Sequence, residues 1–222
     1  IGYGSSYAHS DLSNTHLALE ALYYSKSLIQ DRPEESAYQL NWDAAISFVS
    51  KCQNLPETNA EEWVSGDPAN RGGFVYFPGD SKAGSQKLAD GKVALRSYGS
   101  MSYAGMLSFI YAELDQSDPR MKAVLQWLTE NYAIDENPGM GDEGLFYYYH
   151  TMAKALALAG LKELVLKDGT VANWRMDLCK KLFNLQRDDG SWSNATQRWW
   201  EGDAVLATSY ALLALERAYP GL

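Results

Sequence analysis

The chain has 222 residues, of which 46% are hydrophobic and 21% charged, a balance typical of globular and not of disordered proteins. Its formal net charge of -9 excludes a nucleic-acid partner, because phosphate backbones require a basic surface, and it disfavours anionic membrane surfaces. No apolar run approaches the roughly 20 residues that span a bilayer, so we expect a soluble chain without a transmembrane segment. The length predicts one domain over residues 1–222.

In chain order, short polar residues at 11–15 predict a helix start, because their side chains accept hydrogen bonds from first-turn N–H groups, and that helix continues to about Gln30. A second helix is expected over residues 36–51, whose apolar residues recur at helical spacing. Residues 53–96 have no such period. Their glycines and prolines around residues 74–77 indicate a short hairpin on an elaborated loop.

Further helices are expected over residues 97–113, from the Asp118–Pro119 N-cap pair onward, over 143–159, around Trp174, and over 203–217. They alternate between helices that are apolar nearly all round and helices with one apolar stripe. An apolar helix must be surrounded by protein, whereas a striped helix faces water on one side. Hairpins set side by side, each with an inner apolar helix and an outer striped helix, satisfy both demands.

The chain also repeats itself. Residues 15–22 match residues 208–215, and residues 102–107 and 150–158 are looser copies. A second motif is the turn formed by Gln186, Gly190 and Trp192, which follows a predicted outer helix. We expect the Gln186 amide to bond the free N–H groups of the next helix and the Trp192 indole to pack over the turn.

These motifs resemble the squalene cyclase and protein prenyltransferase repeat family, through its Gln-Trp (QW) repeat and through the helix openings at 11–15 and 203–208. The resemblance covers most of the chain except residues 53–96. It implies an all-α fold, an α/α-toroid in which outer helices surround inner ones. The four inner and three outer helices expected here compare with six hairpins in a complete family toroid, so the ring is either partial or complete.

Residues 137–151 resemble a bacterial branch of this family, described only as repeat-containing proteins and often exported. The first residue is Ile1, and residues 1–4 resemble the end of a glycine-aromatic turn, so we expect that upstream sequence was removed. The compartment stays open, with export and removal of a signal as one alternative.

The family's chemistry is only partly present. Hopene-type cyclases protonate an alkene with the middle acid of an Asp-x-Asp-Asp-Thr motif, and the similar stretch here has Ser13 at that position. A serine hydroxyl is far too weak an acid for this step. No Asp-Asp-x-x-Asp motif for magnesium diphosphate is present. His150 resembles the zinc-binding histidine of prenyltransferases, but Cys52 and Cys179 fall on predicted outer helices and not on inner ones, so we expect no metal and no cofactor.

Two groups of candidate site residues follow. The candidate catalytic residues are Asp11, Glu143, His150 and Asp203. Helix capping is the favoured explanation of the three carboxylates, and hydrogen bonding on the inner ring is the favoured explanation of His150. The candidate ligand-binding residues are aromatic side chains at or near inner-helix starts: Tyr98, Tyr103, Tyr147, Tyr148, Trp199 and Trp200, with Phe109 and Tyr210 beside them.

The sequence therefore favours a toroid repeat protein that lacks standard cyclase chemistry and binds an isoprenoid-like, glycan or peptide partner in an aromatic-lined concavity. The alternative is an enzyme, either a terpenoid cyclase of the squalene-hopene type using another acid or, less favoured, a glycan-active α/α-barrel enzyme. Because an incomplete ring would expose an apolar inner-helix flank, we also expect self-association or pairing with upstream hairpins of the same protein.

Overall fold

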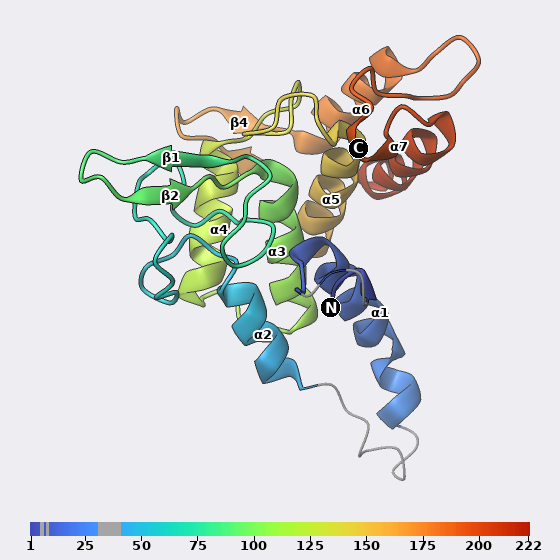
Figure 1. Ribbon diagram of the computed structural model, residues 1–222. Helices are drawn as coiled ribbons and strands as arrows, with labels where there is room; N and C mark the ends of the chain where they lie inside the picture. The colour runs from blue at the N-terminus through green and yellow to red at the C-terminus, as the bar shows by residue number, and fades with distance from the viewer. Residues whose placement is uncertain (5–6, 8, 31–40) are drawn as a thin grey trace.

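The computed structural model describes residues 1–4, 7, 9–30 and 41–222 (Figure 1). Within these residues the chain is mostly helical, with seven α-helices and two short two-stranded hairpins. The helices are α1 (Leu12–Gln30), α2 (Trp42–Ser50), α3 (Gly99–Tyr111), α4 (Pro119–Glu130), α5 (Leu145–Leu158), α6 (Trp174–Leu185) and α7 (Ala204–Ala218). The predicted mostly helical fold is confirmed, whereas an all-α fold in the strict sense is not, because of the two hairpins.

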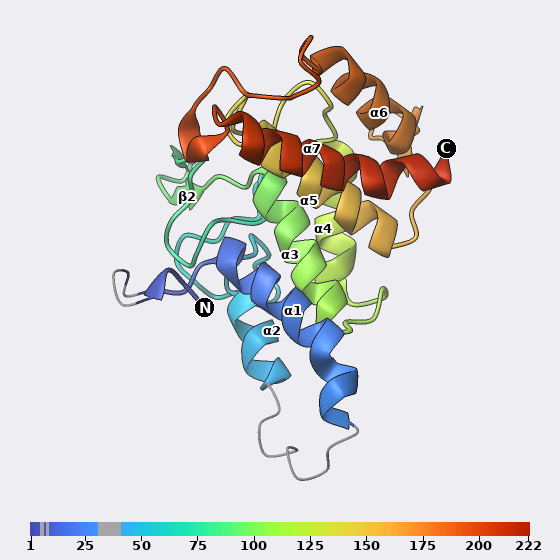
Figure 2. The same cartoon turned by 90° about the vertical axis from the view of Figure 1, so that its right-hand side faces the viewer.

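The helices form two layers. The inner helices α1, α3, α5 and α7 lie side by side in that order and run in the same general direction across Figure 2. The outer helices α2 and α4 pack against α3, and α6 packs against α7. The order of contacts follows the predicted order of hairpins, but the prediction that inner helices are surrounded by protein is wrong for α1 and α7, which expose apolar residues such as Leu17 and Leu212.

Helix α3 lies at the centre of the core. Every residue of this helix except Ile110 is buried, as its freedom from charge predicts. Gly105 lies against the ring of Phe74, and a Cβ atom added there would sit 2.5 Å from that ring, so a larger residue would force the two segments apart. The buried apolar residues form one continuous cluster from α1 to α7.

Each connection that leads into an inner helix also caps the inner helix before it. The N–H of Leu12 at the start of α1 donates to the carbonyl of Tyr76, in the α2–α3 connection, at 2.8 Å. The N–H of Ser100 at the start of α3 donates to Oδ1 of Asn137, in the α4–α5 connection, at 2.9 Å. The start of α5 is capped by Glu201, in the α6–α7 connection. Consecutive hairpins are therefore joined by hydrogen bonds as well as by apolar packing.

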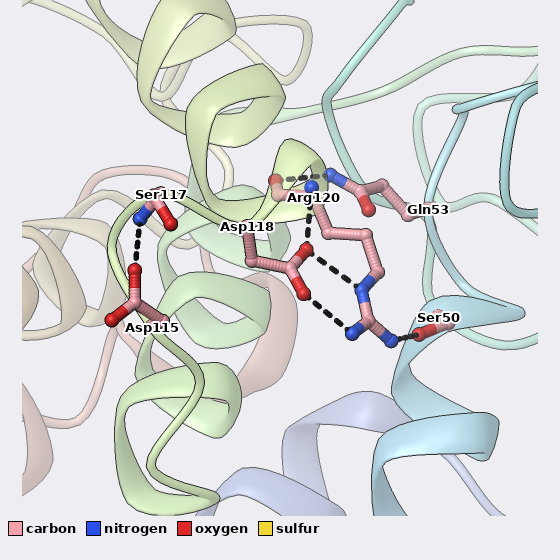
Figure 3. A network of polar contacts seen from close by, with 6 residues as sticks. All are labelled: Ser50, Gln53, Asp115, Ser117, Asp118 and Arg120. Carbon is pink, nitrogen blue, oxygen red and sulfur yellow. Dashed lines mark hydrogen bonds and ion pairs between the residues drawn. The ribbon is translucent and has the colours of Figure 1, made fainter.

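The first two outer helices are joined by a polar network (Figure 3). Asp118 caps α4 by accepting the N–H of Arg120 at 2.8 Å, which confirms the predicted cap. The guanidinium of Arg120 donates to both oxygens of Asp118 and to Oγ of Ser50 at the end of α2. Nε2 of Gln53 donates to the carbonyl of Arg120 at 3.0 Å. This network fixes the start of α4 against the end of α2.

The α2–α3 connection has no helix over residues 53–96, as predicted, and the expected hairpin around residues 74–77 is reduced to an isolated antiparallel bridge between Phe77 and Asp80. Phe74 makes a single bridge to Gln53, and the regular hairpin pairs β1 (Ser85–Lys87) with β2 (Val93–Leu95). The physical reason is burial, because Phe74 packs completely against α3 and is not available to alternate between two faces of a hairpin.

The structure differs from the prediction at one other helix and at one hairpin. The predicted helix over residues 36–51 appears as α2, and residues 36–40 lie outside the described residues. A second hairpin, β3 (Leu164–Val165) with β4 (Val171–Ala172), was not predicted. Strands of two residues are too short to show a recognisable period in the sequence.

The predicted role of Gln186 is wrong. Its Nε2 donates to the carbonyl of Gly190 at 2.9 Å, so the amide closes its own turn and does not reach α7. The first turn of α7 is capped instead by Asp203, whose Oδ1 accepts the N–H of Val205 at 2.7 Å. Because Asp203 satisfies this N–H group locally, the Gln186 amide has no role there.

The predicted role of Trp192 is confirmed. The indole is buried, and its Nε1–H donates to the carbonyl of Leu182 on α6 at 2.8 Å. The backbone N–H of Trp192 donates to Oγ1 of Thr208 on α7 at 3.0 Å. This single residue therefore joins α6 to α7.

Candidate functional site

Asp11 precedes the first inner helix and is completely buried. Its carboxylate accepts hydrogen bonds from the hydroxyl of Ser13 at 2.8 Å and from the backbone N–H of Asn14 at 2.9 Å. The side-chain amide of Asn14 donates to both carboxylate oxygens. Asp11 is therefore placed as a helix cap, and its oxygens are occupied by neighbours in the chain.

The other two candidate carboxylates are also engaged. Glu143 precedes α5 and forms an ion pair with Arg198. Asp203 is the cap of α7. Asp11, Glu143 and Asp203 thus lie at the starts of three different inner helices, and each is held by contacts that account for its position.

Three of the candidate ligand-binding rings belong to the core. Tyr98, Tyr103 and Tyr148 are buried, and the rings of Tyr103 and Tyr148 lie 5.7 Å apart. The hydroxyl of Tyr148 donates to the carbonyl of Ala133 at 2.7 Å. Burial raises the pKa of all three phenols, so they stay neutral.

The remaining aromatic candidates gather at the start of α5. The ring of Tyr147 lies 5.7 Å from that of Tyr210 on α7 and 6.1 Å from that of His16 on α1. Trp199 packs over Gly144, the residue before α5. We call the set Tyr147, His150, Trp199, Trp200 and Tyr210 the aromatic mouth.

The tryptophans of the mouth have unusual backbone conformations. Trp199 has φ 54° and Trp200 has φ 66°, values in the left-handed region that bulky residues rarely adopt. The guanidinium of Arg198 stacks on the Trp199 ring at 4.4 Å and pairs with Glu143. Trp199 is 41% exposed and Trp200 is 80% exposed.

Glu201 fixes this tryptophan segment to α5. Its side chain, in a residue only 1% exposed, accepts the N–H of Tyr147 at 2.8 Å and that of Phe146 at 3.2 Å. Nδ2 of Asn194 donates to the same carboxylate at 2.9 Å. Burial raises the pKa of Glu201, and these hydrogen bonds oppose that shift. The sequence pairs Glu201 with Asp203 at a helix start and does not reveal that it caps a different helix.

One turn along α5, His150 stacks on Tyr210 with the ring centroids 5.6 Å apart. Its Nδ1 and the hydroxyl of Tyr147 are buried and have no hydrogen-bond partner among the described residues. Burial, and then the charge of Lys154, lowers the pKa of His150 to about 3, so the imidazole is neutral at pH 7. The mouth therefore holds two unpaired neutral polar groups.

Three polar residues that sequence reasoning missed lie deeper between α1 and α5. Lys154 pairs with Glu20 at 2.7 Å, and Nδ1 of His16 lies 3.3 Å from the carbonyl of Leu12. Burial lowers the pKa of His16 to about 4. The sequence feature that could have revealed them is the presence of charged and imidazole side chains on helices that are otherwise apolar. Because Lys154 and Glu20 carry opposite charges and His16 is neutral, these three residues add no net charge between α1 and α5.

Two hollows lie away from the aromatic mouth. An open one of about 710 Å³ lies between α2 and residues 58–62 and includes Arg120. A smaller, mostly apolar one of about 200 Å³ lies at the ends of α3 and α5. The first contains acidic and basic side chains, and its cation Arg120 is already bonded to Asp118.

The described helices include none that is long and apolar enough to cross a bilayer. Among the same residues, no three His, Cys, Asp or Glu side chains gather in a group that could hold a metal ion. In comparisons with protein-family models, with curated proteins and with solved structures, nothing matched this chain. The family resemblance therefore rests on the motifs in the sequence.

Proposed function

We propose that the chain is a repeat protein of the squalene cyclase and protein prenyltransferase type, forming part or all of an α/α-toroid, and that it binds a ligand at the aromatic mouth without standard cyclase chemistry. Support for the toroid comes from the inner helices that run in the same direction and from the outer helices packed against them. The capping pattern repeats at α1, α3 and α5, as hairpins related by a common rotation require.

The observation that carries the binding proposal is the pair of unpaired polar groups at the mouth. Buried polar atoms are nearly always hydrogen-bonded, because leaving one unpaired costs about 1–3 kcal/mol. The Tyr147 hydroxyl and the His150 Nδ1 lie beside Tyr210, which is only half-buried. A ligand that displaces the Tyr210 ring would supply the missing partners. The aromatic surroundings suit an isoprenoid-like molecule or a glycan.

A binding role fits the carboxylates better than an enzymatic one. The position of the cyclase acid holds Ser13, and Asp11, Glu143 and Asp203 each cap a helix or form an ion pair. The second candidate function, a terpenoid cyclase with one of these acids as proton donor, is supported by the aromatic rings at the mouth, whose faces would stabilise carbocations. Incubation with squalene and with polyprenyl diphosphates decides between them. Cyclised product that Asp11→Asn abolishes would contradict the binding proposal.

The direct test is isothermal titration of the chain with geranylgeraniol and with neutral tetrasaccharides built from glucose, galactose, mannose or N-acetylglucosamine. We expect one of these to bind, and Tyr147→Phe to weaken that binding about tenfold, since one good hydrogen bond is worth about 1.4 kcal/mol. Tyr219→Phe, at an exposed tyrosine after α7, is the matched control and leaves affinity unchanged. If no compound of either class binds, the proposal fails.

A partner surface is also part of the proposal. Helix α7 exposes an apolar stripe of Val205, Leu212 and Leu213 on a segment that has no charge before Glu216. In the inner layer, α5 covers one side of α7, and the stripe is available to a second copy or to further hairpins of the same protein.

A further inference from the structure

The strain at Trp200 is not explained by packing. Consecutive bulky residues with positive φ cost free energy, and such outliers persist where the surrounding structure fixes them, often at functional sites. At Trp199 this cost is offset by packing, because its ring lies against Gly144 and under the guanidinium of Arg198. Trp200 gains little, because it is 80% exposed.

The surroundings hold Trp200 firmly in this conformation. On its N-terminal side Arg198 is tied to Glu143, and on its C-terminal side Glu201 is buried against the first turn of α5. The chain thus presents an indole to solvent from a segment anchored at both ends. An exposed ring on a backbone anchored in this way is suited to stacking, because only side-chain freedom remains to be lost when a ligand binds.

The charges of the mouth restrict the ligand's chemistry. Arg198 is paired with Glu143, and Lys154, deeper between α1 and α5, is paired with Glu20. Arg217 on α7, whose charge also lowers the pKa of His150, has no ion pair among the described residues. His150 is neutral at pH 7, because burial keeps its pKa far below that value. A diphosphate would find two of these three cations already paired, and the chain's formal net charge of -9 would repel it.

The polar groups that remain unpaired favour hydroxyls. The Tyr147 hydroxyl both donates and accepts, and an imidazole Nδ1 does one or the other according to its tautomer. A saccharide combines such hydroxyls with an apolar face of C–H groups that packs on an indole in water. An isoprenoid chain has no use for unpaired polar groups and gains most from an enclosed apolar pocket, which Trp200 does not offer.

We propose that the ligand of the aromatic mouth is a neutral saccharide, one ring of which stacks on the indole of Trp200 while its hydroxyls bond the polar groups beside Tyr210. This rests on the proposed binding function and adds the ligand's class and the residue that recognises it. The left-handed conformation of Trp200 serves to display the ring.

The test uses Trp200→Gly and Trp200→Asn, because glycine and asparagine both tolerate the left-handed region. The full chain carrying either substitution is expected to unfold about 2–4 °C higher, since backbone strain is relieved without loss of buried surface. The same variants are expected to bind the tetrasaccharide panel at least tenfold more weakly, measured by isothermal titration. Phe183→Ala, at an exposed ring on α6 with ordinary helical backbone, is the control and leaves saccharide affinity unchanged.

The outcomes separate this inference from the proposed function. If geranylgeraniol binds in a Tyr147-dependent way and no tetrasaccharide does, the saccharide proposal is overturned and the binding function stands. If neither class binds, both fail. If Trp200→Gly binds the saccharide with unchanged affinity, the stacking role of Trp200 is overturned, although saccharide binding by the chain stands.

Discussion

At the scale of single residues, Glu201 has the greatest structural effect on the aromatic mouth. It holds the first turn of α5, the Asn194 amide and the strained tryptophans together. We expect Glu201→Ala to lower the free energy of unfolding by about 2–3 kcal/mol, because three donors lose their acceptor in a buried position. Urea denaturation followed by circular dichroism measures this loss.

The matched control is Glu143→Ala, which removes a partly exposed ion pair from the same corner. It should cost less than about 1 kcal/mol, because solvent screens such a pair. Equal losses for the two variants would show that Glu201 has no special structural role.

The two buried histidines predict acid sensitivity. Burial lowers the pKa of His16 to about 4 and that of His150 to about 3, from an unfolded value near 6.5. Below pH 6.5 the unfolded chain therefore binds more protons than the folded chain, so stability is complete above that pH and falls as the pH drops toward 4. His150→Phe keeps a ring against Tyr210 and should flatten the decline between pH 6.5 and 5. A slope identical to that of the unmodified chain would contradict this assignment.

Sequence reasoning succeeds at residues whose role is local. The Asp118 cap and the packing of Trp192 follow from a few neighbouring residues, and both are confirmed. It fails at residues that act across hairpins. Nothing near Glu201 in the sequence indicates that it caps α5, some 55 residues earlier, because that pairing exists only when two hairpins are packed together.

At the scale of elements, the start of α4 offers a clean comparison of two aspartates (Figure 3). Asp118 caps the helix and binds the Arg120 guanidinium through both oxygens. Asp118→Ala should lower the free energy of unfolding by about 1–2 kcal/mol. Asp115, three residues earlier, bonds only the N–H of Ser117 within its own turn, so Asp115→Ala should leave thermal unfolding almost unchanged. A larger effect from Asp115 would contradict the capping role of Asp118.

The elements themselves were predictable in proportion to their length. Long helices such as α3 and α5 bury most of their surface, so a long run with little or no charge predicts them. The hairpin of β1 and β2 has only three residues in each strand and buries only one of the six, so no pattern of burial marks it in the sequence. Phe74 misled the prediction because a buried loop ring and a strand residue look alike in sequence.

At the scale of the whole molecule, the exposed flank of α7 predicts self-association. Val205 is 76% exposed and Leu212 is 54% exposed, on the same stripe of the helix. We expect light scattering to show a mass above that of one chain at high concentration, because exposed apolar side chains gain free energy when a second surface covers them.

The double variant Val205→Glu with Leu212→Glu should restore a monomer, since charge would be buried without a partner in any such interface. Val171→Glu, at an equally exposed apolar residue on β4, is the matched control and should not change the mass. A monomer from the unmodified chain at every concentration would remove the case for this surface.

The capping pattern also restricts how such a chain can be shortened or lengthened. Deleting α6 and α7 would do more than remove two helices, because it would take away the acceptor that the opening turn of α5 needs. The truncated chain should therefore fray at the first turn of α5, which it still contains. Helix α7 does not depend on a later connection in this way, because Asp203 accepts the N–H of Val205 in its own first turn.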